Sequence, residues 1–376
     1  MELICDRHLC TGCGACLNVC PTAAITMKEK KAGHIYPVIN SQKCLNCGKC
    51  QKICPVNQSV LFYNPTTAYA AWAKDDREHI SSTSGGAAAV FTNFVLEKGG
   101  VVYGSVFDGK FLHKRIDNRE DTAKLKGSKY VHSHTERTFK EVEADLKGER
   151  WVLYIGTPCQ IAGLRCYLER EYERLVTVDL ICHGVPSQKL LFEHLKSCGV
   201  ERDKIENISF RNPNGFYLTV DYADRQQYQK RNLDDLYYIA FSDNLTFRDS
   251  CYNCVYAKAV RVGDLTIGDF WGLGKEMPFE QTVKNGISVI LVNSEKGRAL
   301  LENCKKHLHL VERTVNEAVK GNFNLRSPSF SKNHEIFAKK YERLGCEKAL
   351  KQCLRVKRMK YFILKFYLKA RNVLKK

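Results

Sequence analysis

Between residues 66 and 200, short apolar runs alternate with longer stretches of helical periodicity. The runs at 68–73, 100–107, 151–156 and 175–182 predict strands, and the stretches at 84–100, 136–147, 159–171 and 187–199 predict helices. Strands that are apolar along their whole length and alternate with helices are typical of a parallel sheet covered on both faces. This part of the chain is therefore predicted to be an α/β unit.

The pattern changes after residue 205. The runs ISF (208–210), YLTVDYA (217–223) and LTIGDF (265–270) predict a more β-rich part. Earlier in the chain, residues 57–66 carry turn residues at both ends, which is typical of a linker. The length of 376 residues suggests two or three domains.

The C-terminal stretch 356–376 predicts an amphipathic helix with a basic surface. The 27 residues from Leu350 onward contain ten Lys or Arg and no Asp or Glu, so they supply more than half of the net charge of +18. Three interpretations stay open for this helix: peripheral contact with anionic lipid, docking to an acidic partner, or packing against its own domain. Because the rest of the chain is only mildly basic, nucleic acid is not an expected partner. The apolar stripe of the helix consists of Val356, Met359, Ile363, Phe366, Ala370 and Val373.

Eighteen of the residues are cysteine. The chain shows no N-terminal segment of the secretory type and no apolar run long enough to span a membrane. We therefore expect a cytoplasmic protein that contacts the inner face of the membrane, if at all, only through its tail. Cysteines in a cytoplasmic chain of this size more often bind metal or carry out redox chemistry than form disulfides.

Eight of these cysteines fall in two motifs of identical spacing. CTGCGACLNVCP (10–21) and CLNCGKCQKICP (44–55) both follow C-x2-C-x2-C-x3-C-P, the run that holds two [4Fe–4S] clusters in bacterial ferredoxins. Zinc sites usually pair two C-x2-C units and do not call for the final proline. Three cysteines of one motif are expected to surround one cluster, while the fourth begins a helix that leads away to the other. Cluster one is thus assigned to Cys10, Cys13, Cys16 and Cys54, and cluster two to Cys44, Cys47, Cys50 and Cys20. Cys5, close by, is expected to be a packed strand residue.

Four scattered cysteines are candidates for a third metal site. Cys159 follows the strand 151–156 and Cys182 ends the strand 175–182, so both reach one sheet edge if these strands are parallel neighbours. Cys251 and Cys254 add a C-x2-C pair, and four thiolates suffice for another [4Fe–4S] cluster. The spacing alone leaves a zinc site, a redox dithiol and an activated nucleophile at Cys159 open.

The segment SSTSGG (81–86) places hydroxyl side chains and two glycines directly before a predicted helix. This arrangement suits a phosphate at the helix N-terminus, but Ser and Thr are also ordinary helix caps. Lys129 is available to pair with a phosphate or to face solvent. The absence of a G-x-G-x-x-G motif disfavours a Rossmann-type NAD or FAD domain.

Taken together, these motifs resemble the coenzyme F420 hydrogenase/dehydrogenase beta-subunit family, in the form with a fused two-cluster ferredoxin. The resemblance covers about residues 1–275 in family order. Besides the cysteine motifs, it rests on STSGG (82–86), GSKYV (127–131), GTPCQIAGL (156–164), CHGVPS (182–187) and GDLTIGDFWG (263–272).

The resemblance implies an FAD-binding module with its own [4Fe–4S] cluster beside the flavin. It makes Cys159, Cys182, Cys251 and Cys254 the ligands of this third cluster. It makes Ser82, Thr83, Ser84, Gly85, Gly86, Lys129 and Asp269 flavin contacts, with Phe270 and Trp271 in the nearby wall. No catalytic residue is assigned, because His183 is equally a candidate acid–base group and a structural neighbour of the cluster.

The expected fold class is α+β multidomain: a bacterial-type dicluster ferredoxin, then an α/β flavin-binding module with a more β-rich C-terminal part and a basic helical tail. The expected divisions are a ferredoxin-like domain (1–60), a beta-subunit N-terminal-like region (66–150), a C-terminal-like region with the third cluster (151–310) and the tail (311–376).

The function that the resemblance implies is an iron–sulfur flavoprotein oxidoreductase that passes electrons between [4Fe–4S] clusters and FAD. Its expected partners are a redox partner protein or ferredoxin and a small two-electron substrate, of which the deazaflavin F420 is one. One alternative is a non-catalytic electron-transfer subunit for a partner enzyme, with surface-polysaccharide biosynthesis as one setting. Another is a zinc or thiol enzyme with a ferredoxin appendage.

Overall fold

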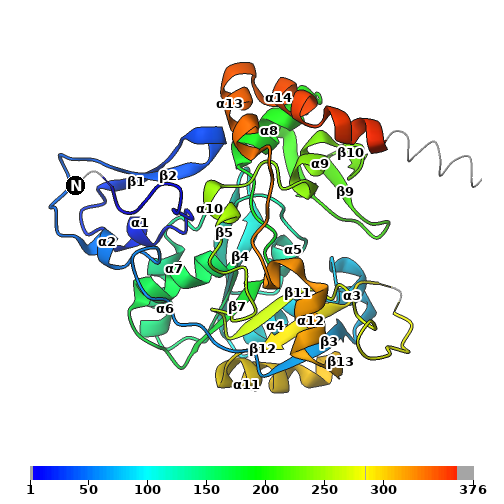
Figure 1. Cartoon of the computed structure of the whole chain (residues 1–376). Coiled ribbons are helices and arrows are strands. Elements are labelled where there is room, and N and C mark those ends of the chain that lie inside the picture. Colours follow the sequence, from blue (N-terminus) through cyan, green and yellow to red (C-terminus); the bar gives the residue numbers. More distant parts are fainter. Residues whose placement is uncertain (1–2, 284, 362–376) are drawn as a thin grey trace, which may run out of the picture.

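A computed structural model describes residues 3–283 and 285–361 (Figure 1). An eight-stranded mixed sheet forms the centre of the larger lobe. The strand order is β13 (Leu308–Arg313), β3 (Thr67–Ala73), β12 (Ser288–Val292), β11 (Leu265–Asp269), β7 (Leu175–Leu180), β6 (Val152–Gly156), β4 (Val101–Phe107) and β5 (Phe111–Ile116). The four consecutive strands β11, β7, β6 and β4 are parallel to one another. In contrast, β5, β12 and β13 are antiparallel to the strands beside them.

Helices cover both faces of this sheet, as the apolar strands predict. On one face, α4 (Ala87–Glu97) and α11 (Glu295–Cys304) bury Phe91 and Leu301 against Leu153 of β6. On the other face, α6 (Thr138–Lys147) and α7 (Pro158–Leu168) bury their apolar side chains against Tyr154, the next residue of the same strand. Over β3 and β12 this face is covered by α12 (Val315–Gly321). The predicted α/β unit is therefore confirmed.

A second, smaller lobe lies above the sheet in Figure 1. Its antiparallel sheet has the order β10 (Gln226–Arg231), β9 (Tyr217–Tyr222) and β8 (Ile205–Ser209). Around it pack α8 (Gln188–Ser197), α9 (Leu236–Ser242), α13 (His334–Leu344) and α14 (Cys346–Cys353), over a core that contains Phe210, Leu218 and Tyr237. The predicted β-rich part is confirmed for residues 205–231. LTIGDF, however, is β11 of the large sheet, because it pairs in parallel with β7.

The N-terminal domain consists of α1 (Ala15–Val19), the hairpin β1 (Ile25–Glu29) and β2 (Ile35–Ile39), and α2 (Lys49–Lys52). It lies beside α6, α7 and α10 (Asp249–Tyr252) in Figure 1. Residues 57–66 contain no helix or ladder strand, in keeping with the predicted linker. The remaining short elements are α3 (Asp76–Ser81), α5 (Thr122–Leu125) and 3₁₀ turns at Lys31–Gly33, Arg202–Lys204, Lys305–His307 and Phe323–Leu325.

The C-terminal part is only partly described. Residues 355–361 are helical, and Val356 and Met359 of the apolar stripe are exposed there. The rest of the predicted basic helix lies outside the described residues, and so do its stripe residues Ile363, Phe366, Ala370 and Val373. No helix within residues 3–283 and 285–361 combines the length and the apolar composition that crossing a bilayer requires.

Candidate functional site

The N-terminal domain gathers its motif cysteines into two groups. One small cavity is lined by Cys10, Cys13, Cys16 and Cys54, and another by Cys20, Cys44, Cys47 and Cys50. Each group combines three cysteines of one motif with the last cysteine of the other, which is the arrangement that the spacing predicts. In the first group, burial raises the pKa of Cys13 and Cys16, and the neighbouring thiolates raise it further.

Two details of this domain differ from the prediction. The fourth cysteine of each motif follows a short helix instead of beginning one, because Cys20 is the C-cap of α1 and Cys54 comes after α2. α1 thus carries Cys16 to one group and Cys20 to the other. Cys5 is not a strand residue: it lies in a bend, lines the first cavity and hydrogen-bonds with Cys10 and Cys54. Its contact with Cys10, together with the Arg248 guanidinium, lowers the pKa of Cys10, against the opposing effect of burial.

The four scattered cysteines also come together, at the carboxyl edge of the large sheet. β6 and β7 are parallel neighbours, so Cys159 in the first turn of α7 and Cys182 just after β7 leave the sheet at the same edge. Cys251 lies in α10 and Cys254 shortly after it. Each of the four thiols interacts electrostatically with the other three. Burial raises the pKa of Cys159 to about 11 and that of Cys251 to about 12, and the neighbouring thiolates add to both.

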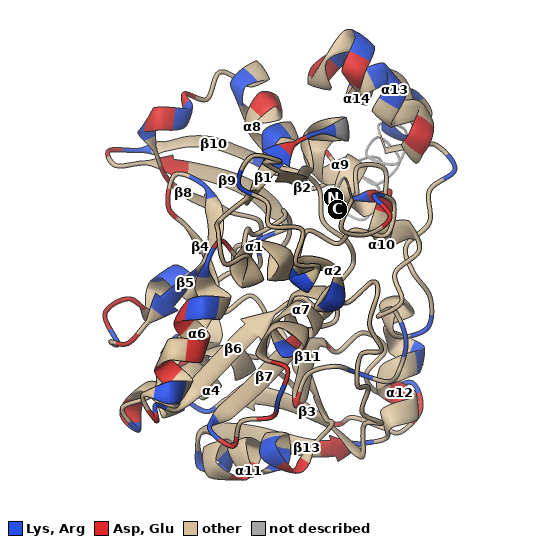
Figure 2. Cartoon of the chain, turned by 90° about the vertical axis from the view of Figure 1, so that its left-hand side faces the viewer, with Lys and Arg blue, Asp and Glu red and all other residues tan. Residues whose placement is uncertain are grey.

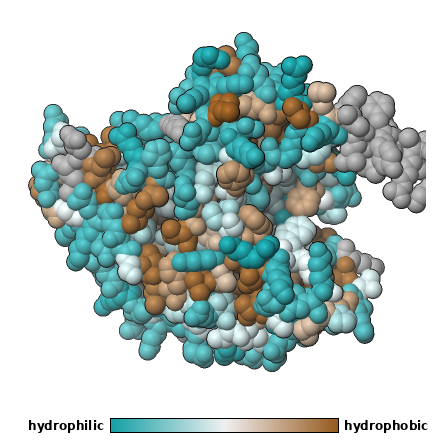
Figure 3. All heavy atoms as spheres, in the orientation of Figure 1, coloured by the Kyte–Doolittle hydropathy of each residue, from teal (hydrophilic) through white to brown (hydrophobic). Residues whose placement is uncertain are grey.

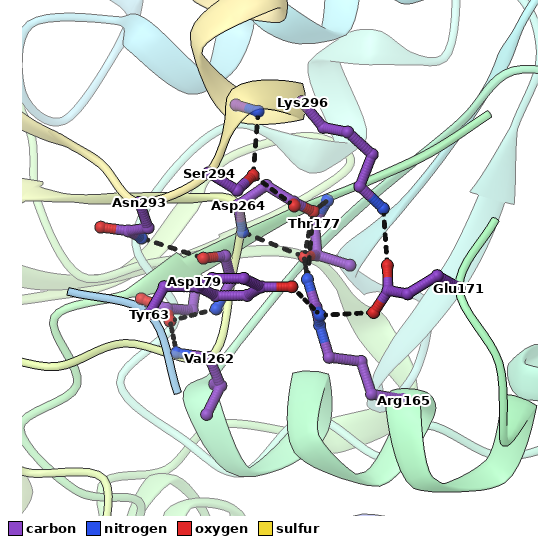
Figure 4. A network of polar contacts seen from close by, with 12 residues as sticks. Tyr63, Arg165, Glu171, Thr177, Asp179, Val262, Asp264, Asn293, Ser294 and Lys296 are labelled. Carbon is purple, nitrogen blue, oxygen red and sulfur yellow. Dashed lines mark hydrogen bonds and ion pairs between the residues drawn. The ribbon is translucent and has the colours of Figure 1, made fainter. Parts of the chain in front are cut away.

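A buried polar network fixes the loop that carries Cys254 (Figure 4). Asp179 in β7 accepts hydrogen bonds from Arg261 Nη2 at 2.7 Å and from the Gly263 backbone N–H at 2.8 Å. Arg261 in turn donates to the backbone carbonyl of Tyr256 at 3.0 Å. Both charged side chains are almost fully buried. The loop after the C-x2-C pair is thereby held to the strand that leads to Cys182.

A second carboxylate ties the neighbouring elements together. Asp264, fully buried, accepts hydrogen bonds from the Thr177 backbone N–H at 2.8 Å and from Ser294 Oγ at 2.6 Å. Arg165 Nη2 on α7 reaches the same carboxylate at 3.3 Å. These contacts join β7, α7 and the start of α11, which sets the position of the helix that carries Cys159 (Figure 4).

The three thiol groups form a series from the surface to the sheet edge. Cys50 of the second group interacts with Cys16 of the first, and Cys13 of the first interacts with Cys159 of the third. Cys47, at the outer end, is exposed, whereas all four thiols of the first group are buried. In the part of the chain that the structure describes, no three His, Cys, Asp or Glu side chains are gathered closely enough to hold a single metal ion.

A cavity of about 720 Å³ lies at the same sheet edge, between the two lobes. Its walls come from the segments after β3, β6 and β7 on one side and from Phe216, Tyr238 and Phe241 of the second lobe on the other. Figure 3 shows that the outline of the molecule is indented where the lobes meet. Ligands of open α/β sheets bind at this edge, and the volume suits a cofactor. Cys182 lies in the wall, so the third thiol group borders the cavity.

Most of the predicted cofactor residues line this cavity. They are Ser82, Thr83, Ser84, Gly86, Lys129 and Asp269. Gly85 packs instead against the sheet, where a Cβ would lie 2.0 Å from the carbonyl oxygen of Ala71. Trp271 also lines the cavity, whereas Phe270 is buried in the core beneath it.

The N-terminus of α4 opens into the cavity without a side-chain cap. Gly86 is the N-cap, with φ of 84°, and the following residues 87–89 line the cavity. The ordinary cap interpretation of SSTSGG is therefore wrong, and the helix N–H groups stay available to an anion. Ser84 Oγ and Ser105 Oγ are buried in this wall without a hydrogen-bond partner in the described part of the chain. Orphaned hydroxyls of this kind fit a polar ligand.

Lys129 does not face solvent. Its Nζ donates to the carbonyl oxygens of Leu125 at 2.8 Å and Lys126 at 2.7 Å, and burial lowers the pKa of its ammonium to about 7. His183 lines the cavity with Nδ1 3.2 Å from Asn324 Oδ1, and burial lowers its pKa, so it is neutral at pH 7.

Arg211 and His132 are among the cavity residues that were not found from the sequence. Arg211 of the second lobe forms a bidentate salt bridge with Asp269, in which Nη1 donates to Oδ1 at 3.0 Å and Nη2 to Oδ2 at 2.6 Å. No motif surrounds it, and only the packing of the two lobes brings it to the site. His132 lies in the cavity wall and also near Gly12, where a Cβ would be 2.9 Å from His132 Cε1. Its place directly after GSKYV was an available signal.

Comparison with known proteins gives two family matches. Residues 149–318 match the C-terminal part of the family "Coenzyme F420 hydrogenase/dehydrogenase, beta subunit", and residues 9–58 match "4Fe-4S dicluster domain". The coenzyme F420-dependent sulfite reductase of Methanocaldococcus jannaschii is 27% identical over 209 residues, which make up 51% of this chain. This chain covers only 30% of that relative's length. In the F420-reducing [NiFe] hydrogenase complex of Methanosarcina barkeri, one chain matches with a TM-score of 0.49 and 15% identity, over 75% of this chain and 94% of that chain.

Proposed function

We propose that this chain is an iron–sulfur flavoprotein oxidoreductase, because residues 9–58 match the 4Fe–4S dicluster domain and residues 149–318 match the C-terminal part of the coenzyme F420 hydrogenase/dehydrogenase beta subunit. It passes electrons between three [4Fe–4S] clusters and FAD, to or from a small two-electron substrate. The observation that carries the proposal is the unbroken series of thiol groups from the exposed Cys47 to Cys182 in the cavity wall.

The three groups fit the clusters that the proposal requires. Each has four cysteines, the number of thiolate ligands that a [4Fe–4S] cluster requires. Cys10, Cys13, Cys16 and Cys54 would hold the first cluster, Cys20, Cys44, Cys47 and Cys50 the second, and Cys159, Cys182, Cys251 and Cys254 the third. Since buried thiols of raised pKa must lose their protons to bind iron, assembly of the third cluster releases protons.

The cavity fits a flavin nucleotide. A bound flavin would exchange hydride with a two-electron substrate and single electrons with the clusters. The uncapped α4 N-terminus and Ser84 would bind its phosphates, and the Arg211–Asp269 pair would hold the opposite wall in place.

The outer end of the thiol series is the proposed docking face for a redox partner protein. Cys47 is exposed there beside Leu45, whose side chain is 68% exposed. Lys43, Lys49 and Lys52 belong to the same segment, and residues 30–66 contain no Asp or Glu, although Lys52 pairs with Glu169 at 3.5 Å. Figure 2 shows Lys and Arg residues, in blue, along α2. A partner of acidic surface, such as a ferredoxin, fits this charge.

Anaerobic reduction of the reconstituted protein tests the proposal. With reduced F420 or reduced ferredoxin as the donor, we expect bleaching of the flavin and appearance of reduced-cluster EPR signals. Cys182→Ala, which removes one cluster ligand in the cavity wall, should interrupt the transfer from one cofactor type to the other. Protein that binds neither flavin nor iron would contradict the proposal. Reduction by ferredoxin with no turnover of any soluble substrate would favour the electron-transfer subunit instead.

A further inference from the structure

Arg248 is a fully buried cation at the junction between the N-terminal domain and the large lobe. Its guanidinium donates through Nε to the Cys10 carbonyl at 2.5 Å and through Nη1 to the Ile35 carbonyl at 2.8 Å. The remaining nitrogen, Nη2, lies 3.5 Å from Cys10 Sγ. The guanidinium also lies over the ring of Tyr36, 4.1 Å from its centroid. All of these contacts belong to the domain that carries the first thiol group.

The charge of Arg248 has no carboxylate partner. Within residues 3–283 and 285–361, its side chain bonds only to two carbonyls and a thiol. The other fully buried arginine, Arg261, is neutralised by Asp179 at 2.7 Å. Because an isolated buried charge is costly, an anion is required at this place.

The thiol groups are the anions within reach. Arg248 Nη2 reaches the Sγ of Cys10 in the first group, and the Arg248 backbone carbonyl accepts a hydrogen bond from the N–H of Cys251 in the third group at 2.8 Å. A [4Fe–4S] cluster with four thiolate ligands carries a net negative charge that grows by one on reduction. A buried cation bonded to a ligand sulfur stabilises the reduced form more than the oxidised form, because the surrounding dielectric is low.

We propose that Arg248 raises the reduction potential of the cluster held by Cys10, Cys13, Cys16 and Cys54. An electron that passes between the surface and the cavity therefore resides preferentially on this cluster. The inference rests on the proposed function, because it requires the cluster. The site is shaped for an arginine: at Gly12, a Cβ would lie 3.1 Å from Arg248 Nη1, so the loop approaches the guanidinium without a side chain between them.

The test is an EPR-monitored redox titration of the full chain, with iron counted in each variant. Arg248→Gln removes the charge, and we expect the reduced-to-oxidised ratio of the first cluster at a fixed potential to fall about tenfold, which is 59 mV for one electron. Arg248→Lys keeps the charge but loses the planar fork, so a smaller fall is expected. Cys47→Ala and Cys159→Ala, which affect the other two clusters, assign the signals. Arg313→Gln is the matched control, since Arg313 is buried but pairs with Glu317, and it should leave all potentials unchanged.

An unchanged potential in Arg248→Gln protein that retains its iron would overturn the inference while leaving the proposed function intact. If that variant does not retain the cluster, Arg248→Met, which also removes the charge but keeps a long side chain, takes its place, and an unchanged or raised potential would overturn the inference. The absence of any cluster signal in the unaltered protein would instead overturn the proposed function.

Discussion

Cys13 and Gly163 are in direct contact across the junction of the N-terminal domain and α7. A Cβ on Gly163 would lie 2.8 Å from both Cβ and Sγ of Cys13. Gly163 is one helical turn after Cys159, so this contact sets the distance between the first and third thiol groups. Only a residue without a side chain allows the domain to lie this close.

Gly163→Val should push the N-terminal domain away from α7. Overpacking of this kind costs about 1–3 kcal/mol, and the separation should slow electron transfer between the first and third clusters. Rapid-mixing EPR, with a reduced donor added at the outer cluster, measures that rate. The control is Gly148→Ala, because a Cβ at Gly148 would make only ordinary contacts at 3.5 Å. Equal rates in both variants would show that the contact does not set the path.

Asp179→Asn should remove the third cluster selectively. The substitution leaves the buried Arg261 guanidinium unpaired, and breaking a buried pair typically costs about 3–5 kcal/mol. Because that pair holds the loop after Cys254, we expect the iron content to fall by about four atoms per chain, with the two N-terminal clusters retained. Glu317→Gln breaks the similarly buried pair with Arg313 and should destabilise the protein without loss of iron. Loss of all clusters in Asp179→Asn, or of none, would contradict the assignment.

Flavin binding should weaken as the pH rises above neutrality. Burial lowers the pKa of Lys129 to about 7, and a bound phosphate would raise it. Above pH 7 the side chain must therefore take up a proton on binding, so the Kd for FAD should rise by up to about tenfold per pH unit. Fluorescence titrations of FAD across this range measure the Kd. Lys129→Gln should bind more weakly with a flat profile, and a flat profile in the unaltered protein would exclude Lys129 from the phosphate site.

Stability of the second lobe should fall between about pH 6.5 and 9. Burial disfavours the charge on His194, but the Asp235 carboxylate, 2.8 Å from Nε2, raises its pKa from 6.5 to about 9. A raised folded-state pKa adds stability that is complete below the unfolded-state pKa and is lost as the pH rises through the folded-state value. Asp235→Asn keeps the helix cap of α9 and should abolish this dependence in urea denaturation. The same pH dependence in both proteins would rule out the pair as its source.

The local features of this protein could be predicted from its sequence. The spacing of the two cysteine motifs determines the ligand groups, because ligand reach depends on a few residues. The apolar strands that precede Cys159 and Cys182 predict the meeting of these two thiols, since parallel neighbours end at one edge. The SSTSGG segment was predicted to bind a ligand, and it lines the cavity, although its serines do not cap the helix.

The features that could not be predicted depend on distant contacts. β11 lies between β7 and β12 because of its pairing partners, and its own alternation does not specify them. Arg248 and Arg211 stand outside any motif, and each acquires its role only where two domains or lobes meet. Cys5 lies outside the two motifs, and a single cysteine offers no ligand spacing from which a metal site could be predicted. It was therefore assigned to core packing, yet it lies against Cys10 and Cys54.

The presence of three clusters and a flavin is tested most directly by counting the iron atoms, sulfides and flavin molecules per chain in anaerobically purified protein. Three four-iron clusters beside a flavin require about twelve iron atoms, about twelve sulfides and about one FAD per chain, and this is the result we expect. About eight iron atoms and no flavin would contradict it, since only the two N-terminal clusters would then be accounted for.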